Sequence, residues 1–250
     1  MTARVVLFAK QPVAGRVKSR LAKGLGTARA TGFYRNTTRI ICHRLSRDPR
    51  WQLVLSRTPD HWLPGPPVFP PGLRSTPQGS GDIGDRMARL ARRFSDGPVI
   101  LVGSDIPTLQ AGHITSALRC LKSADIVFGP ATDGGFWLVG YSARAARHAR
   151  FGKIAWSTGT VLKDCLAGLG TTRVSLLPPQ SDIDDVGDYR AWRASGKMLF
   201  QPRHQFDQIA GPVPAVELIA KDIIPAVLAG PGGTGQGKQI SPVRDTAGGP

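Results

Sequence analysis

The chain has 250 residues, 41% of them hydrophobic, which is enough for one sizeable buried core and does not require a second domain of similar size. Its 33 lysines and arginines outnumber its 17 acidic residues, and the net charge of +16 can attract nucleic acid, anionic membranes or phosphorylated small molecules without choosing among them. Three widely spaced cysteines fit neither a disulfide framework nor a metal site, and no apolar run is long enough to span a membrane, so we expect a cytoplasmic protein with reduced thiols.

Short β-rich runs alternate with helical patterns over about the first 195 residues, which is typical of a mostly parallel sheet covered by helices. The run PVILVGS at 98–104 is the most apolar and predicts a central strand. A Pro/Gly-rich loop is expected at 59–77. The pattern predicts strands at 4–9, 51–56, 98–104, 125–130, 135–141 and 172–178, and helices at 27–46, 82–94, 110–122, 158–167 and 184–195.

The pattern ends near residue 200, where glycine, proline and glutamine become frequent. We therefore expect residues 1–199 to form the folded domain and residues 200–250 to form a disordered extension. A short helix over 216–228 is the one regular element expected in this extension, and no catalytic residue is expected there.

Charged segments follow several of the predicted strands. A cationic segment with Lys10, Gly15, Arg16, Lys18 and Arg20 follows the first strand. Later segments carry carboxylates, which must come from aspartate because the chain has a single glutamate; they contain Asp105, Asp133 before Gly134 and Gly135, and Asp182, Asp184, Asp185 and Asp188. Because the carboxyl ends of parallel strands meet at one edge of the sheet, we expect these segments to converge.

Cations on one loop and carboxylates on its neighbours suit a polyphosphate bound together with a divalent metal. Arginine binds phosphate through two N–H groups, lysine acts as a point charge, and glycine lets the backbone approach phosphate oxygens. Mg²⁺ or Mn²⁺ would take one or two carboxylates, which suits Asp105 and an aspartate of the 182–188 segment.

Each of these segments also has a purely structural interpretation. Asp105 could cap a helix or brace a turn, and Asp133-Gly134-Gly135 could form a hairpin turn. The aspartates at 182–188 could be the acidic start of the last helix, and Lys18 and Arg20 could be solvated cations at a helix start. No single segment decides between the two interpretations.

The order of the segments is more specific. FAKQPVAGRVKSRLA, QGSGDIGDRM, GSDIPTL, GPATDGGFWLVG, the WST of residues 156–158 and SDIDDVGDY follow one another as they do in a bacterial family of glycosyltransferase-A-like proteins, which this chain resembles over about residues 4–195. That family is often described as nucleotide-diphospho-sugar transferases, and some members are proposed to act in arsenosugar biosynthesis. A more distant resemblance is to the 2-phospholactate guanylyltransferases, which carry a KSRLA-type segment, an Asp-Gly-Gly loop and a late aspartate motif.

The resemblance implies an α/β fold with one Rossmann-like, mostly parallel sheet of the nucleotide-diphospho-sugar transferase type. It implies catalytic roles for Asp105, Lys18 and Asp133, and metal binding by Asp105 and Asp184. The nucleotide and its phosphates would contact Lys10, Gly15, Arg16, Lys18, Arg20, Gly81 and Asp82, and the acceptor would contact Asp133, Gly134, Gly135, Trp156, Ser157 and Thr158. The chain departs from the family at Asp85, where glutamate is usual, and at Asp185 and Gly187, which replace a small hydroxyl residue and an acidic residue.

The expected function is therefore a metal-assisted transferase with a nucleotide-sugar donor, a small-molecule acceptor, and Mg²⁺ or Mn²⁺ as cofactor. The alternative is a nucleotidyltransferase that joins a nucleoside triphosphate to a small phosphorylated or acidic acceptor. Both reactions depend on positioning and electrostatics rather than on a covalent nucleophile. A third possibility is a non-catalytic nucleotide or nucleic-acid binder, although the arginines are scattered and lack the interleaved aromatic residues typical of nucleic-acid surfaces.

Overall fold

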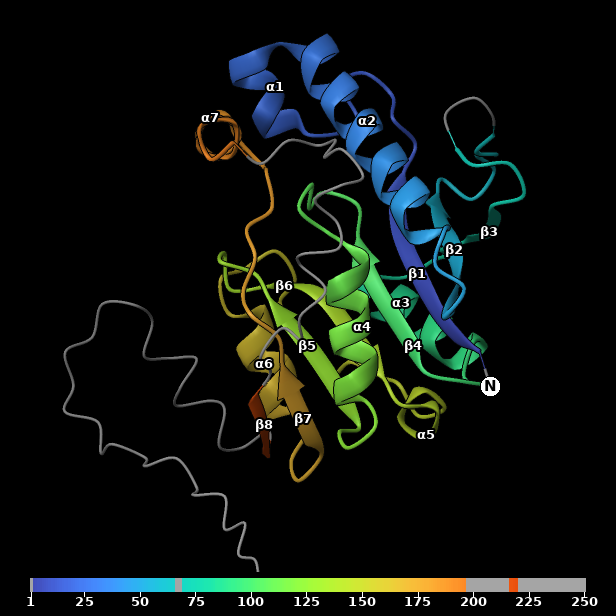
Figure 1. The fold of residues 1–250 in the computed structure, drawn as a ribbon. Helices are drawn as coiled ribbons and strands as arrows, with labels where there is room; N and C mark the ends of the chain where they lie inside the picture. The colour runs from blue at the N-terminus through green and yellow to red at the C-terminus, as the bar shows by residue number, and fades with distance from the viewer. Residues whose placement is uncertain (1, 66–68, 197–215, 220–250) are drawn as a thin grey trace, which may run out of the picture.

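The computed structural model describes residues 2–65, 69–196 and 216–219, which form one eight-stranded sheet with helices on both faces (Figure 1). The strands are β1 Ala3–Lys10, β2 Trp51–Thr58, β3 Arg74–Pro77, β4 Val99–Gly103, β5 Ile126–Pro130, β6 Phe136–Tyr141, β7 Arg173–Leu176 and β8 Val216–Ile219. The helices are α1 Ser19–Leu25, α2 Thr27–Leu45, α3 Ile83–Arg93, α4 Ala111–Cys120, α5 Ala143–Ala146, α6 Val161–Ala167 and α7 Val186–Ala194.

The strand order is β3-β2-β1-β4-β6-β5-β7-β8. Strands β3, β2, β1 and β4 are mutually parallel, β5 and β7 are parallel to each other, and β6 is antiparallel to both β4 and β5. Strand β8 pairs antiparallel with β7 at the edge. The mostly parallel sheet with β4 in its interior confirms the fold class and the central strand predicted from the sequence.

Alternating apolar residues divide the core into two layers. On β1, Val5 and Leu7 point to one side and Val6 to the other, because successive side chains of a strand face opposite ways. The first side packs against α2 and α4, and the second against α3, α5 and α6 (Figure 1). Both faces of the sheet are thus covered, which leaves its carboxyl edge as the place where loops converge.

Two helices outside these layers pack on each other near that edge. A Cβ on Gly24 of α1 would lie 2.6 Å from Cβ of Val186 in α7, so the missing side chain allows this close packing. Leu21 of α1 is fully buried in a small cluster that also holds Ile183, just before α7. The packing of α1 and α7 brings the segment after β1 next to the segment after β7.

The predicted elements agree with the structure along most of the described chain, with three additions and one correction. Helix α5 and the short strand β3 were not predicted, and α1 was considered only as the alternative in which Lys18 and Arg20 lie at a helix start. The helix expected over 216–228 is wrong where the structure can test it, because residues 216–219 form strand β8. Val216 and Ile219 favour strands, and the edge of β7 offers unpaired backbone groups. The other residues of the predicted 200–250 extension lie outside the described part of the chain.

Of the helices that the structure describes, none combines the length and the apolar character needed to cross a membrane.

Candidate active site

A cleft of about 450 Å³ opens at the carboxyl ends of β1 and β4. Its charged lining consists of Lys10, Arg16, Lys18, Arg20, Asp105 and Asp184. Lys10, Arg16 and Arg20 are exposed, so their charges are available to a ligand, whereas Lys18 is drawn inward to the carboxylates. The cleft therefore joins the cationic segment after β1 to aspartates from two later segments.

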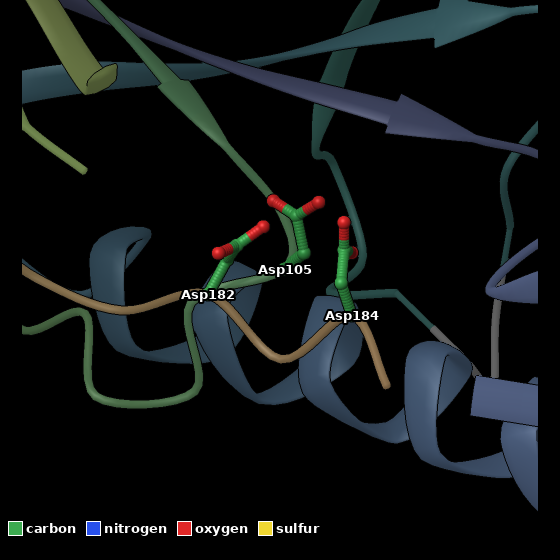
Figure 2. Close-up of side chains that lie close together, drawn as sticks. All are labelled: Asp105, Asp182 and Asp184. Atoms are coloured by element: carbon green, nitrogen blue, oxygen red, sulfur yellow. The ribbon is translucent and has the colours of Figure 1, made fainter. Parts of the chain in front are cut away.

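Three aspartates meet at the side of this cleft where Asp105 lies. One carboxylate oxygen from each of Asp105, Asp182 and Asp184 lies within 4.8 Å of the others (Figure 2). Asp182 and Asp184 flank Ile183, which is buried in the cluster under α1 and α2. With Ile183 anchored in the core, its two neighbours both point toward Asp105, as Figure 2 shows. Asp105 thus comes from the loop after β4, and Asp182 and Asp184 come from the segment after β7.

The position of Asp105 depends on small and polar neighbours at the end of β4. A Cβ on Gly103 would lie 2.8 Å from Oδ1 of Asp105, so a side chain there would crowd the carboxylate. Ser104 is buried, and its hydroxyl lies 3.1 Å from the hydroxyl of Tyr34, which in turn accepts a hydrogen bond from the backbone N–H of Lys10. Tyr34 of α2 therefore ties the ends of β1 and β4 together.

Lys18 forms ion pairs with two of the three aspartates. Its Nζ donates to Oδ1 of Asp184 at 2.6 Å and to Oδ2 of Asp105 at 3.3 Å, and its side chain is only 6% exposed. Burial by itself lowers the pKa of this ammonium, but the charge of Asp105 and the hydrogen bond to Asp184 outweigh burial, so the pKa is raised above its usual value. Lys18 is therefore positively charged at neutral pH.

Asp182 differs from its two neighbours because no ion pair of the described residues reaches it. Burial, followed by the charges of Asp184 and Asp105, raises the pKa of Asp182 from 3.8 to about 6, and Lys18 offsets only part of this effect. The cluster thus holds more negative charge than Lys18 alone can balance.

The chemistry of this cluster fits a hard divalent cation. Carboxylate oxygens are the preferred ligands of Mg²⁺ and Mn²⁺, and three of them converge here. The Lys18 ammonium already lies against two of the three, so a cation is accommodated at this position.

A second cavity, of about 280 Å³, adjoins the cleft on the far side of Asp105. The two cavities share Phe8, Ile83, Gly103 and Asp105. The second one also contains Asp182 and Asp133, together with residues of the 156–158 loop. A hydrogen bond of 3.0 Å from the N–H of Leu162 to the carbonyl of Gly134 ties the hairpin between β5 and β6 to the start of α6, which follows this loop.

Most of the residues singled out from the sequence lie in one of these two cavities. Lys10, Arg16, Lys18, Arg20, Asp105 and Asp184 line the cleft, and Asp105, Asp133, Gly135, Trp156, Ser157 and Thr158 line the second cavity. Four others line neither: Gly15, Gly81, Asp82 and Gly134. Asp82 instead caps α3, accepting from the N–H of Asp85 at 2.8 Å while Asp85 accepts from the N–H of Asp82.

The sequence left open whether the aspartates of residues 182–188 and of the Asp133-Gly134-Gly135 stretch serve a ligand or only the fold. Asp185 caps α7 by accepting from the N–H groups of Gly187 and Asp188, and Asp188 accepts from those of Asp184 and Asp185. These two are helix-capping residues. Asp133-Gly134-Gly135 likewise forms the turn of the β5–β6 hairpin, yet the side chain of Asp133 still lines a cavity.

Three residues of the site were not singled out from the sequence, although Asp182 belongs to the acidic segment from which one metal ligand was expected. Asp182 completes the carboxylate cluster, Tyr34 connects the strand ends, and buried Gln78 donates to the carbonyls of Ala9 and Ser56 along the cleft floor. The apolar Ile183 between two aspartates was an available signal for Asp182, because alternation predicts one buried residue between two that point to the same side. Tyr34 and Gln78 carry no such local signal.

The comparisons with known proteins agree with this architecture. Residues 41–158 match the model of a family described as "Uncharacterized protein conserved in bacteria (DUF2064)". A crystal structure from Desulfovibrio desulfuricans, provisionally named a nucleotide-diphospho-sugar transferase, is 26% identical over 79% of this chain and 89% of its own, with a TM-score of 0.69. No curated protein sequence matches the chain.

Two further enzymes share only their fold with this chain, because about a tenth of the aligned residues are identical. The 4-diphosphocytidyl-2C-methyl-D-erythritol synthase from Anaerococcus prevotii is 10% identical, covers 79% of this chain and 99% of its own, and has a TM-score of 0.50. A CMP:2-keto-3-deoxy-manno-octonic acid synthetase complexed with CTP is 9% identical, covers 79% and 100%, and has a TM-score of 0.50. By its fold and its similarity to the Desulfovibrio structure, the chain resembles the nucleotide-diphospho-sugar transferases, and residues 41–158 match the model of the DUF2064 family.

Proposed function

We propose that this protein is a metal-assisted transferase that uses a nucleotide donor, with glycosyl transfer from a nucleotide sugar to a small acceptor as the leading candidate. The observation that carries the proposal is the cleft itself, in which exposed cations lie beside a three-carboxylate cluster at the carboxyl edge of the sheet. A nucleoside diphosphate group bound with a divalent metal is complementary to both halves of this cleft.

The cations of the cleft would bind the donor phosphates. Arg16 and Arg20 can each bind phosphate through two N–H groups, and Lys10 adds a point charge at the end of β1. Each charge-assisted contact is worth about 1.5–3 kcal/mol, so two or three of them would dominate donor binding. Lys18 is proposed to pair with the donor phosphates once a divalent ion balances the carboxylates.

Asp105, Asp182 and Asp184 would hold the metal. A bound Mg²⁺ or Mn²⁺ would neutralise charge on the phosphates and on the leaving nucleoside diphosphate. The surrounding residues would do the positioning: Tyr34 fixes the ends of β1 and β4, and Asp133 lies in the neighbouring cavity, where an acceptor hydroxyl could pass its proton to the carboxylate.

The comparisons support this proposal at the level of the superfamily. The Desulfovibrio relative carries the name of a nucleotide-diphospho-sugar transferase, and the synthetase with the same fold was solved with CTP. Nucleotidyl transfer from a nucleoside triphosphate is the second candidate, because a triphosphate would use the same cations and carboxylates.

A thermal-shift screen of the full chain tests the proposal. Nucleoside triphosphates and nucleotide sugars are each added with and without Mg²⁺ or Mn²⁺. A donor at about a hundred times its Kd adds about 2.7 kcal/mol of stability, which raises Tm by about 5–10 °C for a chain of this length. We expect such a shift only when metal is present.

Two variants with the same change of charge make the screen specific. Asp105→Asn should lose most of the metal-dependent shift, whereas Asp96→Asn, an exposed residue beyond the opposite end of β4, should keep it. If no nucleotide raises Tm under any metal condition, the proposal is wrong. Nucleotide or nucleic-acid binding that needs no metal and falls steeply with salt would instead favour a non-catalytic binder.

A further inference from the structure

The two cavities that meet at Asp105 differ sharply in charge. Four of the residues that line the cleft are cationic. The lining of the second cavity contains three aspartates, Asp105, Asp133 and Asp182, and no lysine, arginine or histidine among the residues that the structure describes. A phosphate or carboxylate group would therefore meet cations on one side of Asp105 and only carboxylates on the other.

The second cavity is otherwise apolar and aromatic. Phe8, Phe136, Trp137 and Trp156 line it together with Met87, and the hydroxyls of Ser157 and Thr158 add polar groups. Trp156 lies close against α3, where a Cβ on Gly84 would come within 2.4 Å of its indole ring. Phe151 also contacts this indole edge-on, with ring centroids 5.4 Å apart, so the indole is held in place. Such a lining suits a molecule with a flat apolar portion.

We infer that the acceptor of this transferase is a neutral or cationic small molecule with an apolar, ring-like portion and a free hydroxyl or amine, and not a phosphorylated or carboxylate-bearing molecule. This inference rests on the proposed function, and it names the substrate class of the second cavity. It also favours glycosyl transfer over nucleotidyl transfer to a phosphorylated or acidic acceptor.

The charges around the cavity give the physical reason. An anion entering it loses hydration and faces carboxylates without a compensating cation in the described lining, which is unfavourable. A divalent ion brings two positive charges to the three clustered aspartates, and Lys18 brings a third only while it stays paired with them, so the cluster is at best neutral. Asp133, which has no ion pair among the described residues, still leaves the cavity net negative.

The group transfer balances with such an acceptor. The acceptor oxygen forms a bond to the anomeric carbon of the donor sugar, and the bond from that carbon to the phosphate oxygen breaks. The electron pair of the broken bond leaves with the nucleoside diphosphate, whose charge the cations of the cleft receive. The hydroxyl proton passes to the Asp133 carboxylate and from there to water. Nothing in this step requires an anionic group on the acceptor.

Three probes that share one ring and differ in charge test the inference: benzyl alcohol, benzylamine as its ammonium ion, and benzoate. Binding to the full chain is followed by saturation-transfer NMR, with and without Mg²⁺. We expect the alcohol and the ammonium ion to bind at least about tenfold more tightly than benzoate, a difference of about 1.4 kcal/mol. Trp156→Leu should weaken all binding that takes place in this cavity.

A charge-neutralising variant and its control test whether the charge of Asp133 causes the preference against benzoate. Asp133→Asn keeps the oxygen that accepts from the N–H of Gly135 at 3.0 Å but removes the charge, so it should narrow the preference against benzoate severalfold. Asp96→Asn makes the same change of charge at a distant exposed site and should leave the preference unaltered.

Tighter binding of benzoate than of benzyl alcohol, or no Trp156-dependent binding of any probe, would overturn the inference even if nucleotides bind with metal as proposed. Conversely, the expected preference for the alcohol together with an absence of any nucleotide-induced shift would leave the cavity's selectivity standing and refute the proposed function. The two failures are therefore distinguishable.

Discussion

The residues with strained, left-handed backbone angles lie in the candidate active site. Only Lys18 (φ 46°) and Ser157 (φ 66°) have left-handed backbone angles among the described residues other than glycine. One lines the cleft and the other the second cavity. Left-handed angles are unfavourable for residues with a side chain, so the surrounding structure must maintain them. For Lys18 the ion pairs with Asp105 and Asp184 provide part of this restraint, which makes it the residue whose replacement is most informative.

Lys18→Met should make nucleotide-free protein less stable and, at the same time, bind metal more tightly. Removing the ammonium leaves Asp105 and Asp184 without their cation, at a cost of about 1–2 kcal/mol because both carboxylates, 40% and 43% exposed, are partly solvated. The same change removes a competitor for the carboxylates, so Mn²⁺ affinity measured by electron paramagnetic resonance without nucleotide should rise about tenfold, or about 1.4 kcal/mol.

Arg20→Met is the matched control, since it removes one positive charge from an exposed residue of the same cleft. It should leave Mn²⁺ affinity nearly unchanged. Equal or weaker Mn²⁺ binding by Lys18→Met would show that the ammonium supports the metal site instead of competing for it.

Asp182 predicts a pH dependence in the metal-free protein. Its pKa is raised from 3.8 to about 6 in the folded state, so the folded protein binds this proton more tightly than the unfolded chain does. The resulting contribution to stability is present below pH 4 and is lost as pH rises through about 6. Asp182→Asn removes this loss, so its stability relative to the parent should increase between about pH 3 and pH 7, about one unit beyond the unfolded and folded pKa values, and then level off.

Urea unfolding in the presence of a chelator, repeated across this range, measures that difference. A difference between variant and parent that stays constant with pH would contradict the raised pKa. Saturating Mg²⁺ should remove the effect, because a bound cation favours the ionised form of Asp182.

At the level of elements, the sequence predicted the strands and helices whose apolar residues recur in a regular pattern. The runs that became β1, β4, β5 and β6 are apolar over five or more residues, β2 has four apolar residues among its first five, and α2 has buried residues at helical intervals. Helix α1 has seven residues with Leu21 as its only buried one, and β3 has four residues inside the Pro/Gly-rich loop. Elements this short are stabilised by pairing and packing with distant residues, which a single sequence does not display.

The site was predictable to the extent that it depends on strand ends. The rule that loops converge at the carboxyl edge placed Lys18, Asp105 and Asp184 together, and the structure shows them in contact. It could not place Asp82 correctly, because whether an aspartate caps a helix or faces a ligand depends on its rotation at the helix start. Nor could it reveal that Asp133 faces a cavity without cations, since that depends on which side chains from six separate segments surround it.

At the scale of the whole molecule, the sheet collects opposite charges from distant parts of the chain. The cations come from residues 10–20, whereas the carboxylates come from residues 105 and 182–184. The net charge of +16 attracts anionic nucleotides from a distance, an effect that salt weakens. In the proposed transferase, discrimination between donor and acceptor would then be local, because the cleft and the second cavity share Asp105 and differ in their remaining charges.

The last prediction concerns how much of the chain the fold needs. We expect residues 1–196 to unfold cooperatively and to keep any metal-dependent nucleotide shift, because the cavities and both core layers lie within them. This shorter chain lacks β8, whose four residues pair with β7. Losing those backbone hydrogen bonds should lower the free energy of unfolding by about 1–3 kcal/mol and leave β7 as an exposed edge prone to self-association.

A chain of residues 1–219 is the control, since it keeps β8 and removes only residues 220–250. From their glycine- and proline-rich composition we expect it to match the full chain in stability. Urea unfolding and light scattering of the three chains make the comparison. Loss of the cooperative transition in 1–196 would show that the residues after 196 are integral to the domain. Equal stability of 1–196 and 1–219 would show instead that β8 contributes nothing to the sheet, because the two chains differ by the segment that contains it.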